Sequence, residues 1–588
     1  MHSPINALSR FGRPFHTVPT TPLYAAILAL CAVPHAYAQT APAGNSAGNI
    51  LQQNQGLLAP DNDTRTAAPP PDPIHPGASS PSASVPPQTV YVQHFELDKP
   101  LDEPLAMQVR RLLASAEGRD LTFAQIVQVR DKLTALLQSH YGILTFVVVP
   151  EQDASKGTLR FQMIRGRVES ITLRNRSRVS DDTLERIFRT RQIATLSASE
   201  QGGVDRVLHA ANLARALPGV ASITPTLTEG ATEGGTKVMV DVAPAPAFEA
   251  AVVTDNAGSA GSGRYRVGTQ LTVNNPLGIG DRARVLGYAA PGSVQDRIGR
   301  DGRTWIGLAS YDAPLGFSGT RAGIQYSKVG YALGGGLKDL GSGYASVVSF
   351  YANHPLVLTS RNEFRMGVQY SRKNLNDEFF GINALRRSNV ASLLAYGTHY
   401  GQLAGKPNGL QYSSELDVGS LWLVDLGLTA DPRTSGRSTK WTGSADFTQL
   451  LWRGADIRAR VSAQLASKHL DPSEQMSLGG PNAVRAYGYD VPNVDQGALA
   501  SLDLSQQIPR LTGVSTRVFA DVGRGQINRN GGVFGSDNTW MAAGYGVGLT
   551  YQYRNRLRLD LAQAFRLGTP RGMAPDRSQT WFTATYFL

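Results

Sequence analysis

The residues best suited to chemistry are scattered along this chain. The histidines after residue 38 show no ligand spacing; they are His75, His94, His140, His209, His354, His399 and His469. Asp495 and Asp503 are interpreted as lumen or loop residues rather than as a general acid and base. The run from Asn274 to Gly280 is interpreted as a strand-to-turn segment and not as a phosphate loop. We therefore expect no catalytic residue, no cofactor and no metal, and a protein that is not an enzyme.

The only cysteine, Cys31, lies in a segment with the pattern of an export signal. Basic residues precede an apolar run from Leu23 to Val33, and Ala36-Tyr-Ala38 provides a small-x-small cleavage site. We interpret residues 1–38 as a signal peptide. Cleavage after Ala38 leaves a mature chain without cysteine, which excludes disulfides and thiol chemistry.

The chain has a net charge of +11, from 57 Lys and Arg against 46 Asp and Glu. A basic balance is one feature of nucleic-acid-binding proteins. However, there is no compact basic patch with interleaved aromatic residues, and arginines alternate with apolar residues along predicted strands instead. This placement favours a charged channel wall. We predict no nucleic-acid partner.

Residues 247–588 form a succession of short segments with one apolar face. Between Ile457 and Leu465 every second residue is apolar, and the others are Arg458, Arg460, Ser462 and Gln464. One such strand would fit a soluble sandwich. Many strands of about ten residues with this alternation indicate lipid on one side and a wet lumen on the other. No run of about twenty apolar residues is present, so a membrane-spanning structure must be a closed antiparallel β-barrel.

Residues 39–87 precede the globular part of the chain. The stretch 67–87 is rich in proline and small residues, which cannot form a core, and we interpret it as an extended linker. The stretch 47–58 differs because it carries four apolar residues at near-helical spacing, namely Ile50, Leu51, Leu57 and Leu58. A short amphipathic helix and a tail with a few leucines both fit this pattern, and the sequence leaves both open.

Two tandem units of about 75 residues lie between the linker and the predicted barrel. The first, residues 88–168, is expected to contain a strand, two helices and two strands, at Val90–Leu97, Leu105–Ala116, Phe123–His140, Leu144–Val149 and Thr158–Val168. The second, residues 169–246, repeats this β-α-α-β-β order and ends at two prolines.

Several motifs, in order along the chain, resemble the TpsB transporters of two-partner secretion. The first unit resembles a POTRA domain through His140-Tyr-Gly-Ile143, Val149-Pro-Glu-Gln-Asp153, Gly157-Thr-Leu-Arg160 and Gly166-Arg-Val168. The predicted barrel adds Thr254-Asp-Asn-Ala-Gly258, Asn274-Asn-Pro-Leu-Gly278, Leu478-Gly-Gly-Pro-Asn-Ala-Val-Arg-Ala-Tyr487, Phe519-Ala-Asp521 and Gly544-Tyr-Gly-Val-Gly548. Together these motifs cover nearly the whole mature chain.

This resemblance implies two periplasmic POTRA domains and a sixteen-stranded barrel in the outer membrane of a Gram-negative bacterium. About 340 residues leave about 21 for each strand and its connection, which is sufficient. The resemblance also implies a pore that binds a large unfolded partner through its POTRA domains and exports it without ATP. Such partners are adhesins, haemolysins or contact-dependent toxins. The alternative is a barrel-assembly insertase of the same superfamily, which usually carries more POTRA domains.

Capture of an extended partner would use strand addition to an open POTRA sheet edge. The expected edges are near Leu144–Val149 and Val220–Leu227, and the sequence leaves open which of them is free. The other implied partners are outer-membrane lipid and the barrel-assembly machinery during insertion.

In the same family, the loop after the eleventh strand folds back into the lumen, where its arginine pairs with a wall carboxylate. The matching loop residues are Val484, Arg485, Ala486 and Tyr487, and the matching wall residues are Phe519 and Asp521. The strand alternation supports this match, because Phe519 and Asp521 share a face opposite to three apolar residues. The alternative is an exposed loop arginine. Ala486 stands where the family most often has glycine, so the form of the turn is left open.

In this family, a helix at the mature N-terminus can sit in the lumen as a removable plug, and residues 47–58 are the matching segment. The following linker of about 28 residues reaches about 85 Å when extended, which is enough to connect the lumen with the periplasm.

Overall fold

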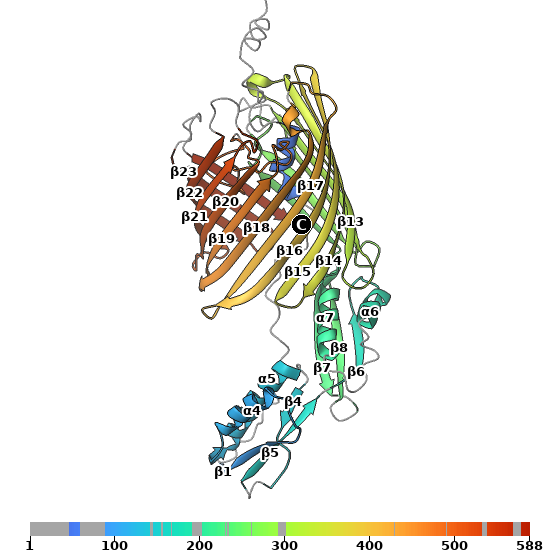
Figure 1. Ribbon diagram of the computed structural model, residues 1–588, viewed down its shortest axis with the longest axis vertical. Helices are drawn as coiled ribbons and strands as arrows, with labels where there is room; N and C mark the ends of the chain where they lie inside the picture. The colour runs from blue at the N-terminus through green and yellow to red at the C-terminus, as the bar shows by residue number, and fades with distance from the viewer. Residues whose placement is uncertain are drawn as a thin grey trace, which may run out of the picture.

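The computed structural model describes residues 46–58, 89–141, 145–153, 157–165, 167–190, 203–229, 231, 235–259, 261–291, 302–428, 430–489, 491–531, 538–568 and 578–588. The predicted signal peptide and the predicted proline-rich linker lie outside the described residues. Figure 1 shows a barrel with two small domains below it. Among the described residues, no helix is both long and apolar enough to cross a membrane.

Sixteen antiparallel strands close into a barrel in which each strand pairs with its neighbours in the chain. Their bounds are Phe248–Asp255 (β9), Arg266–Asn274 (β10), Arg282–Ala290 (β11), Arg303–Pro314 (β12), Arg321–Ala332 (β13), Gly341–Leu358 (β14), Asn362–Phe379 (β15), Ile382–Leu403 (β16), Lys406–Leu423 (β17), Gly436–Trp452 (β18), Ala455–Ala466 (β19), Gln496–Gln507 (β20), Val514–Gln526 (β21), Thr539–Tyr553 (β22), Leu557–Arg566 (β23) and Ser578–Phe587 (β24). Pairing of 583–587 with 251–255 joins β24 to β9 and closes the ring. The predicted sixteen-stranded barrel is confirmed.

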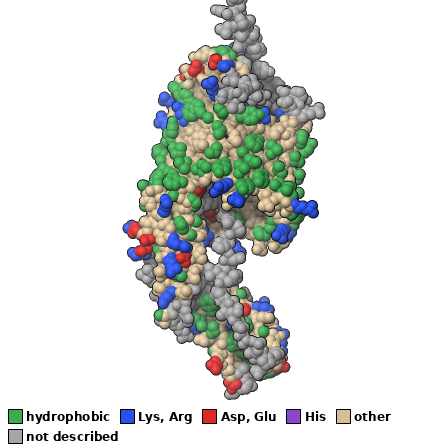
Figure 2. All heavy atoms as spheres, turned by 180° about the vertical axis from the view of Figure 1, so that it is seen from behind, with side chains coloured by type: hydrophobic (Ala, Val, Ile, Leu, Met, Phe, Trp, Pro, Cys, Tyr) green, Lys and Arg blue, Asp and Glu red, His purple; other side chains and the backbone are tan. Residues whose placement is uncertain are grey.

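The outer surface of the barrel is apolar. Figure 2 shows hydrophobic side chains as a broad band across the face of the barrel that is turned to the viewer. In β19, Val461 and Leu465 are 52% and 57% exposed, whereas Gln464 is 4% exposed and bonds to the loop inside the barrel. Successive strand residues point to opposite faces, so the predicted alternation places the apolar residues on the lipid side.

The lumen is less uniformly polar than the alternation predicted. Strands β11 to β15 present an apolar patch to the inside, which includes Leu286, Ile306, Leu308, Val329 and Leu375. These residues lie beside outward-facing apolar residues such as Val285 and Trp305, so both faces of these strands are apolar. A water-filled lumen would disfavour this patch, and the structure covers it with the segment of residues 46–58.

The first small domain has a three-stranded sheet in the order β2-β5-β4 and a separate β1-β3 pair. Its elements are Thr89–Val92 (β1), His94–Leu97 (β2), Leu105–Ala114 (α4), Arg119–Thr122 (β3), Phe123–Tyr141 (α5), Thr145–Val148 (β4) and Thr158–Arg165 (β5). The single strand predicted over Val90–Leu97 is wrong. The N–H groups of Gln93 and His94 both donate to the Gly157 carbonyl, which separates two strands that belong to different sheets.

The second small domain has the order β-α-α-β-β and touches the barrel. Its elements are Arg167–Asn175 (β6), Asp181–Thr190 (α6), Gly203–Arg215 (α7), Val220–Glu229 (β7) and Gly235–Pro244 (β8), with the sheet order β6-β8-β7. The Ser180 N–H donates to the Gly278 carbonyl in the β10–β11 turn at 2.8 Å. Arg186 lies over the Phe317 ring of the β12–β13 turn, 5.6 Å from its centre. The β10–β11 and β12–β13 turns therefore mark the end of the barrel that faces the two domains.

Candidate functional site

The connection between β19 and β20, the eleventh and twelfth strands of the barrel, folds back into the lumen. We call residues 467–495 the lumenal loop. Most of its residues from Ala483 to Tyr487 are buried, and they pack against side chains of β20 to β24. Bridges at Met476–Val494 and Gly479–Val484 hold the loop in a compact form. The expected return of this loop into the lumen is therefore present in the structure.

Arg485 forms hydrogen bonds with two aspartates of the barrel wall. Its Nε and Nη2 donate to the two carboxylate oxygens of Asp521 at 2.9 and 2.6 Å, and its Nη1 donates to Asp503 at 2.6 Å. The Arg485 backbone N–H also donates to Asp521, at 3.0 Å. The Arg485 side chain is only 6% exposed, so the charges depend on each other for compensation. Sequence reasoning identified Asp521 but not Asp503.

Aromatic residues complete the surroundings of the arginine. The Phe519 ring lies 3.7 Å from the guanidinium carbon of Arg485, a cation–π geometry. The indole N–H of Trp581 on the last strand donates to the Arg485 carbonyl at 2.7 Å. The predicted inward direction of Phe519 and Asp521 agrees with their burial, while Val518 points outward and is exposed.

The loop tip packs on a glycine-rich strand. A methyl group at Gly544 of β22 would lie 2.4 Å from the Ala486 methyl, and one at Gly546 would lie 2.4 Å from the Phe519 ring. The glycines therefore leave the space that the loop and Phe519 fill. Ala486 has no positive φ, so this turn does not require the glycine that the family pattern has there.

Val484 and Tyr487 anchor the loop tip on either side of Arg485 and Ala486. Both are fully buried. Tyr487 makes an edge contact with Trp540, with ring centres 5.5 Å apart, and the guanidinium of Arg566 lies over its other side at 4.5 Å. Val484 lies over Gly523, where an added methyl would be 3.1 Å from it.

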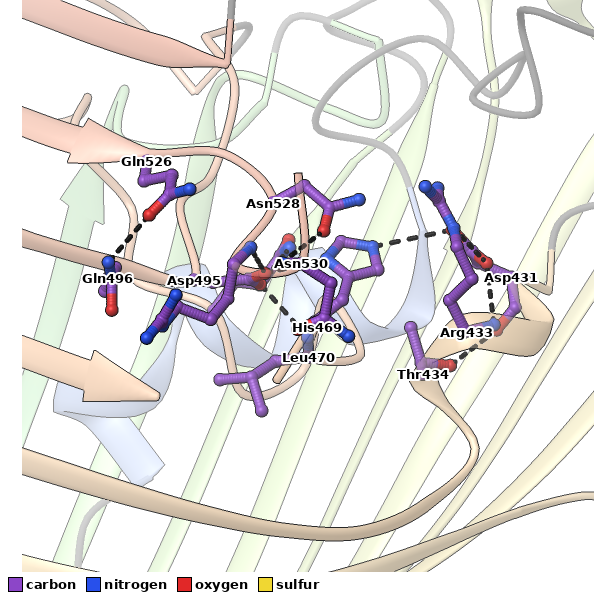
Figure 3. Close-up of polar contacts among 12 residues, drawn as sticks. Asp431, Arg433, Thr434, His469, Leu470, Asp495, Gln496, Gln526, Asn528 and Asn530 are labelled. Carbon is purple, nitrogen blue, oxygen red and sulfur yellow. Dashed lines mark hydrogen bonds and ion pairs between the residues drawn. The ribbon is translucent and has the colours of Figure 1, made fainter. Parts of the chain in front are cut away.

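A second polar cluster joins the loop to neighbouring connections, at the end of the barrel opposite the β10–β11 and β12–β13 turns. Figure 3 shows the residues of this cluster. His469 lies between two carboxylates: its Nδ1 is 2.8 Å from Asp495, and its Nε2 is 3.5 Å from Asp431 of the β17–β18 connection. Asp495 also accepts from the Arg529 N–H of the β21–β22 connection at 2.8 Å. We call His469, Asp431 and Asp495 the clasp, because they tie three connections together.

The clasp favours a protonated histidine. Burial alone would lower the pKa of His469, but hydrogen bonds with Asp431 and Asp495 and their negative charges raise it to about 9. For Asp431, burial alone would raise the pKa, but hydrogen bonds from His469 and Arg433 hold it below its ordinary value. Sequence reasoning set His469 aside because a single histidine has no ligand spacing, and its carboxylate partners are distant in the chain.

Two further acidic residues of the loop form ion pairs with the wall, and sequence reasoning missed both residues. Asp471 binds Arg386 of β16 at 2.5 Å. Glu474 lies between Lys373 of β15 and Lys440 of β18, at 2.5 and 2.7 Å. The only signal in the sequence is that these cations occupy inward positions of their strands. Nothing local connects them with loop residues that lie 34 to 101 positions away in the chain.

The predicted N-terminal segment lies inside the barrel, visible in dark blue in Figure 1. It forms two short helices, Ala47–Gln53 (α2) and Gln55–Leu58 (α3), rather than one. Of the four apolar residues singled out, Ile50, Leu51 and Leu58 are buried on the lumenal apolar patch and Leu57 packs beside it. Polar contacts add to this: Arg266 donates to Asn54 at 2.7 Å, and Gln325 donates to the Leu58 carbonyl at 2.6 Å.

A family model described as "Haemolysin secretion/activation protein ShlB/FhaC/HecB" matches residues 234–551, more than half of the chain. The chain belongs to this family. A second model, the ShlB-type POTRA domain, matches residues 91–166 within the first small domain.

Relatives of the ShlB/FhaC/HecB family resemble the chain over most of its length. The heme/hemopexin transporter protein HuxB of Haemophilus influenzae (strain 86-028NP) is 22% identical over 509 residues, which cover 83% of this chain and 85% of HuxB. The structure of CdiB from Escherichia coli matches with a TM-score of 0.63 at 19% identity, covering 92% of this chain and 98% of CdiB. CdiB from Acinetobacter baumannii gives 0.59 at 17% identity, covering 92% and 96%. These structural matches show a shared fold.

As a member of the ShlB/FhaC/HecB family, the chain is an outer-membrane transporter of two-partner secretion with its POTRA region in the periplasm. Members of this family are transporters rather than enzymes. The predicted role in exporting a partner protein is confirmed at this level, and the family match favours it over the barrel-assembly insertase.

Proposed function

We propose that the lumenal loop and the N-terminal segment together close the pore at rest, and that both must shift when the partner protein passes. The observation that carries this proposal is the type of contact that holds them. Ion pairs and hydrogen bonds join the loop to the wall, and water can replace such contacts when the elements move. The loop tip and the N-terminal segment also make apolar contacts with the wall, so the polar contacts are the part that water can replace.

The Arg485–Asp521 pair acts in this proposal as the latch of the lumenal loop, with Val484, Ala486 and Tyr487 as its packed tip. Asp503 gives the arginine a second carboxylate, which allows the guanidinium to exchange partners without losing compensation. Residues 47–58 act as the plug, with Ile50, Leu51, Leu57 and Leu58 seated on the lumenal apolar patch.

The small domains capture the partner by strand addition. The expected strands β4 and β7 are both at sheet edges, and β2 and β6 form the opposite edges. The Val147 N–H of β4 is directed to the Thr134 hydroxyl at 3.3 Å, which leaves the edge of β4 partly occupied. The ten-residue β7 offers the longer ladder, although Pro225 lacks a donor within it.

The partner is a large unfolded protein, such as an adhesin, a haemolysin or a contact-dependent toxin. Folding of the partner outside the cell drives transport, because the periplasm supplies no ATP and folding prevents return. Outer-membrane lipid surrounds the apolar band, and the barrel-assembly machinery inserts the barrel.

Deletion of residues 88–168 tests the capture step. The expected result is loss of export of the large secreted protein encoded beside this gene, while the heat-modifiable barrel in the outer membrane stays at its normal amount. Normal export by this variant would overturn the role of the first domain.

Deletion of residues 39–58 tests the plug. The expected result is a higher single-channel conductance in planar bilayers, because the lumenal apolar patch is then uncovered and water fills the space. Unchanged conductance would show that the segment does not block the pore.

A further inference from the structure

We propose that Arg386 is a positioning residue that makes the plug segment and the lumenal loop hold each other in the barrel, through Asp377 on one side and Asp471 on the other. This inference rests on the proposed function, in which both elements close the pore. It adds that the two elements share one contact with the wall, so displacement of either one weakens the hold on the other.

The first link joins the plug segment to the wall. Asp377 of β15 accepts hydrogen bonds from the Ala47 N–H and from the Tyr331 hydroxyl, each at 2.7 Å and each on Oδ1. Its second oxygen contacts the guanidinium of Arg386. Asp377 is therefore the point at which the beginning of α2 meets the barrel.

The second link joins the same arginine to the lumenal loop. Arg386 uses Nη1 for Asp471 at 2.5 Å and Nη2 for Asp377. Relative exposures are 2% for Arg386, 1% for Asp377 and 4% for Asp471. Without the arginine, two buried carboxylates would remain uncompensated, so its charge is required by the wall and by the loop at once.

The third link returns from the loop to the plug segment. Asp471 Oδ1 accepts from the backbone and hydroxyl of Ser473, at 3.0 and 2.7 Å, which orders this turn of the loop. Gly48 of α2 lies directly against the turn, because a methyl group there would be 2.7 Å from the Ser473 nitrogen and 3.2 Å from Asp471. The contacts thus form a closed circuit of segment, wall, arginine and loop.

A separate contact joins the same two elements nearer the other end of the loop. The Asn493 side-chain amide donates to the Asn49 side-chain carbonyl at 2.8 Å. The plug segment therefore contacts the lumenal loop near both ends of the loop. By thermodynamic linkage, if the seated plug stabilises the inward loop, the inward loop stabilises the seated plug by the same amount.

Gly48→Ala tests the contact between segment and loop, with Gly56→Ala as the matched control. Alanine favours a helix more than glycine at both sites. A methyl at position 56 meets nothing within 4 Å, whereas one at position 48 meets the loop backbone. We expect Gly48→Ala to raise the fraction of time in the open conductance level about tenfold, and Gly56→Ala to leave it unchanged. Equal behaviour of the two variants would overturn the proposal.

Arg386→Gln tests the arginine itself, with Arg387→Gln as the control because Arg387 is exposed and points to the other face of β16. The readout is cross-linking of cysteines introduced by Asn49→Cys and Asn493→Cys, because the only native cysteine, Cys31, lies in the predicted signal peptide. A short thiol cross-linker should join the pair in the parent and in Arg387→Gln. In Arg386→Gln the yield should fall severalfold. An undiminished yield would overturn the proposal.

The combination Gly48→Ala/Arg386→Gln shows whether the two residues act on one circuit. Its open fraction should be close to that of either single variant, because contacts within one unit are not additive. If the increases in open fraction of the two single variants multiply in the double variant, the contacts are independent and the inference is overturned. These bilayer and cross-linking measurements need no exported partner. If they behave as expected while export is unaffected by Gly48→Ala, the circuit stands and the gating role in the proposed function fails.

Discussion

At the scale of single residues, the lumenal loop is held by charge complementarity. Asp471, Glu474 and Arg485 each lie against a wall residue of opposite sign. A buried charge that loses its partner is strongly destabilising, whereas a complete pair adds little net stability. Such pairs therefore specify where the loop rests more than how stable the barrel is.

The latch pair should behave as one unit. Arg485→Ala leaves Asp521 without its guanidinium, at a cost of about 3–5 kcal/mol to the docked loop if the site stays dry. Asp521→Ala should cost less, because Asp503 still binds the arginine. Export, normalised to heat-modifiable barrel, should fall in both variants. The double variant should be little worse than Arg485→Ala, and additive losses would contradict the pairing.

The clasp should weaken at alkaline pH. The pKa of His469 is about 9 in the folded protein against an ordinary value of 6.5. Its contribution is therefore complete below pH 6.5 and is lost as the pH rises through about 9, with an upper limit of about 3 kcal/mol. Thermal unfolding of the purified protein should show a larger deficit for His469→Gln at pH 7 than at pH 10. An equal deficit at both pH values would show that the histidine is neutral.

At the scale of elements, the glycines of β22 are explained by what packs against this strand. Its glycines at 544 and 546 face inward, where Ala486 and Phe519 occupy the space that side chains would need. Glycine usually weakens a strand because it has no side chain to pack. In β22 this lower strand stability is offset by the close packing of the loop tip against the wall.

Gly544→Ala should displace the loop tip. The new methyl would lie 2.4 Å from that of Ala486, and overpacking of this kind typically costs about 1–3 kcal/mol. Ala486→Gly should restore export in part when combined with it, since the methyl would still lie 2.9 Å from the Phe565 carbonyl. Proteolysis of the loop and export of the partner measure the effect. A failure of Ala486→Gly to improve either readout would contradict the contact.

At the scale of the whole molecule, the second small domain docks on the barrel turns that face it. Leu217 packs over Gly280 in the β10–β11 turn, and Leu213 over Gly319 in the β12–β13 turn. These contacts hold the second small domain against the periplasmic end of the barrel.

Gly280→Ala should loosen this docking, with Gly316→Ala as its control. Both glycines have a positive φ, +81° and +72°, so alanine strains the backbone at both sites. Only at Gly280 would the methyl meet the domain, 2.8 Å from Leu217. Export should fall more for Gly280→Ala, and protease cleavage between domain and barrel should increase. Equal losses in the two variants would assign the effect to turn strain alone.

The alternation of apolar residues over many strands, without an apolar run of about twenty residues, is enough to predict a barrel, whereas the number of sixteen strands came from the resemblance to the TpsB transporters. In Ile457–Leu465 every second side chain must face lipid, and this requirement is written into local sequence. The helix Phe123–Tyr141 was likewise predictable, because its apolar stripe and its cap at Thr122 are local. The pairing of Arg485 with Asp521 was implied by the resemblance to the TpsB transporters, and the strand alternation supported it.

Only the tertiary structure decided how the lumen is filled. Strands and loops that are distant in the chain bring opposite charges together inside the barrel. This explains the ion pairs of Asp503, Arg386 and His469. The apolar patch that contacts Ile50 and Leu51 was not predicted from the sequence. The apolar residues of its strands had all been attributed to contact with lipid. The sequence by itself determined which face of each strand meets lipid, because the bilayer imposes one rule on every strand. What occupies the inside depends on which side chains meet across the barrel, and that follows only from its closure.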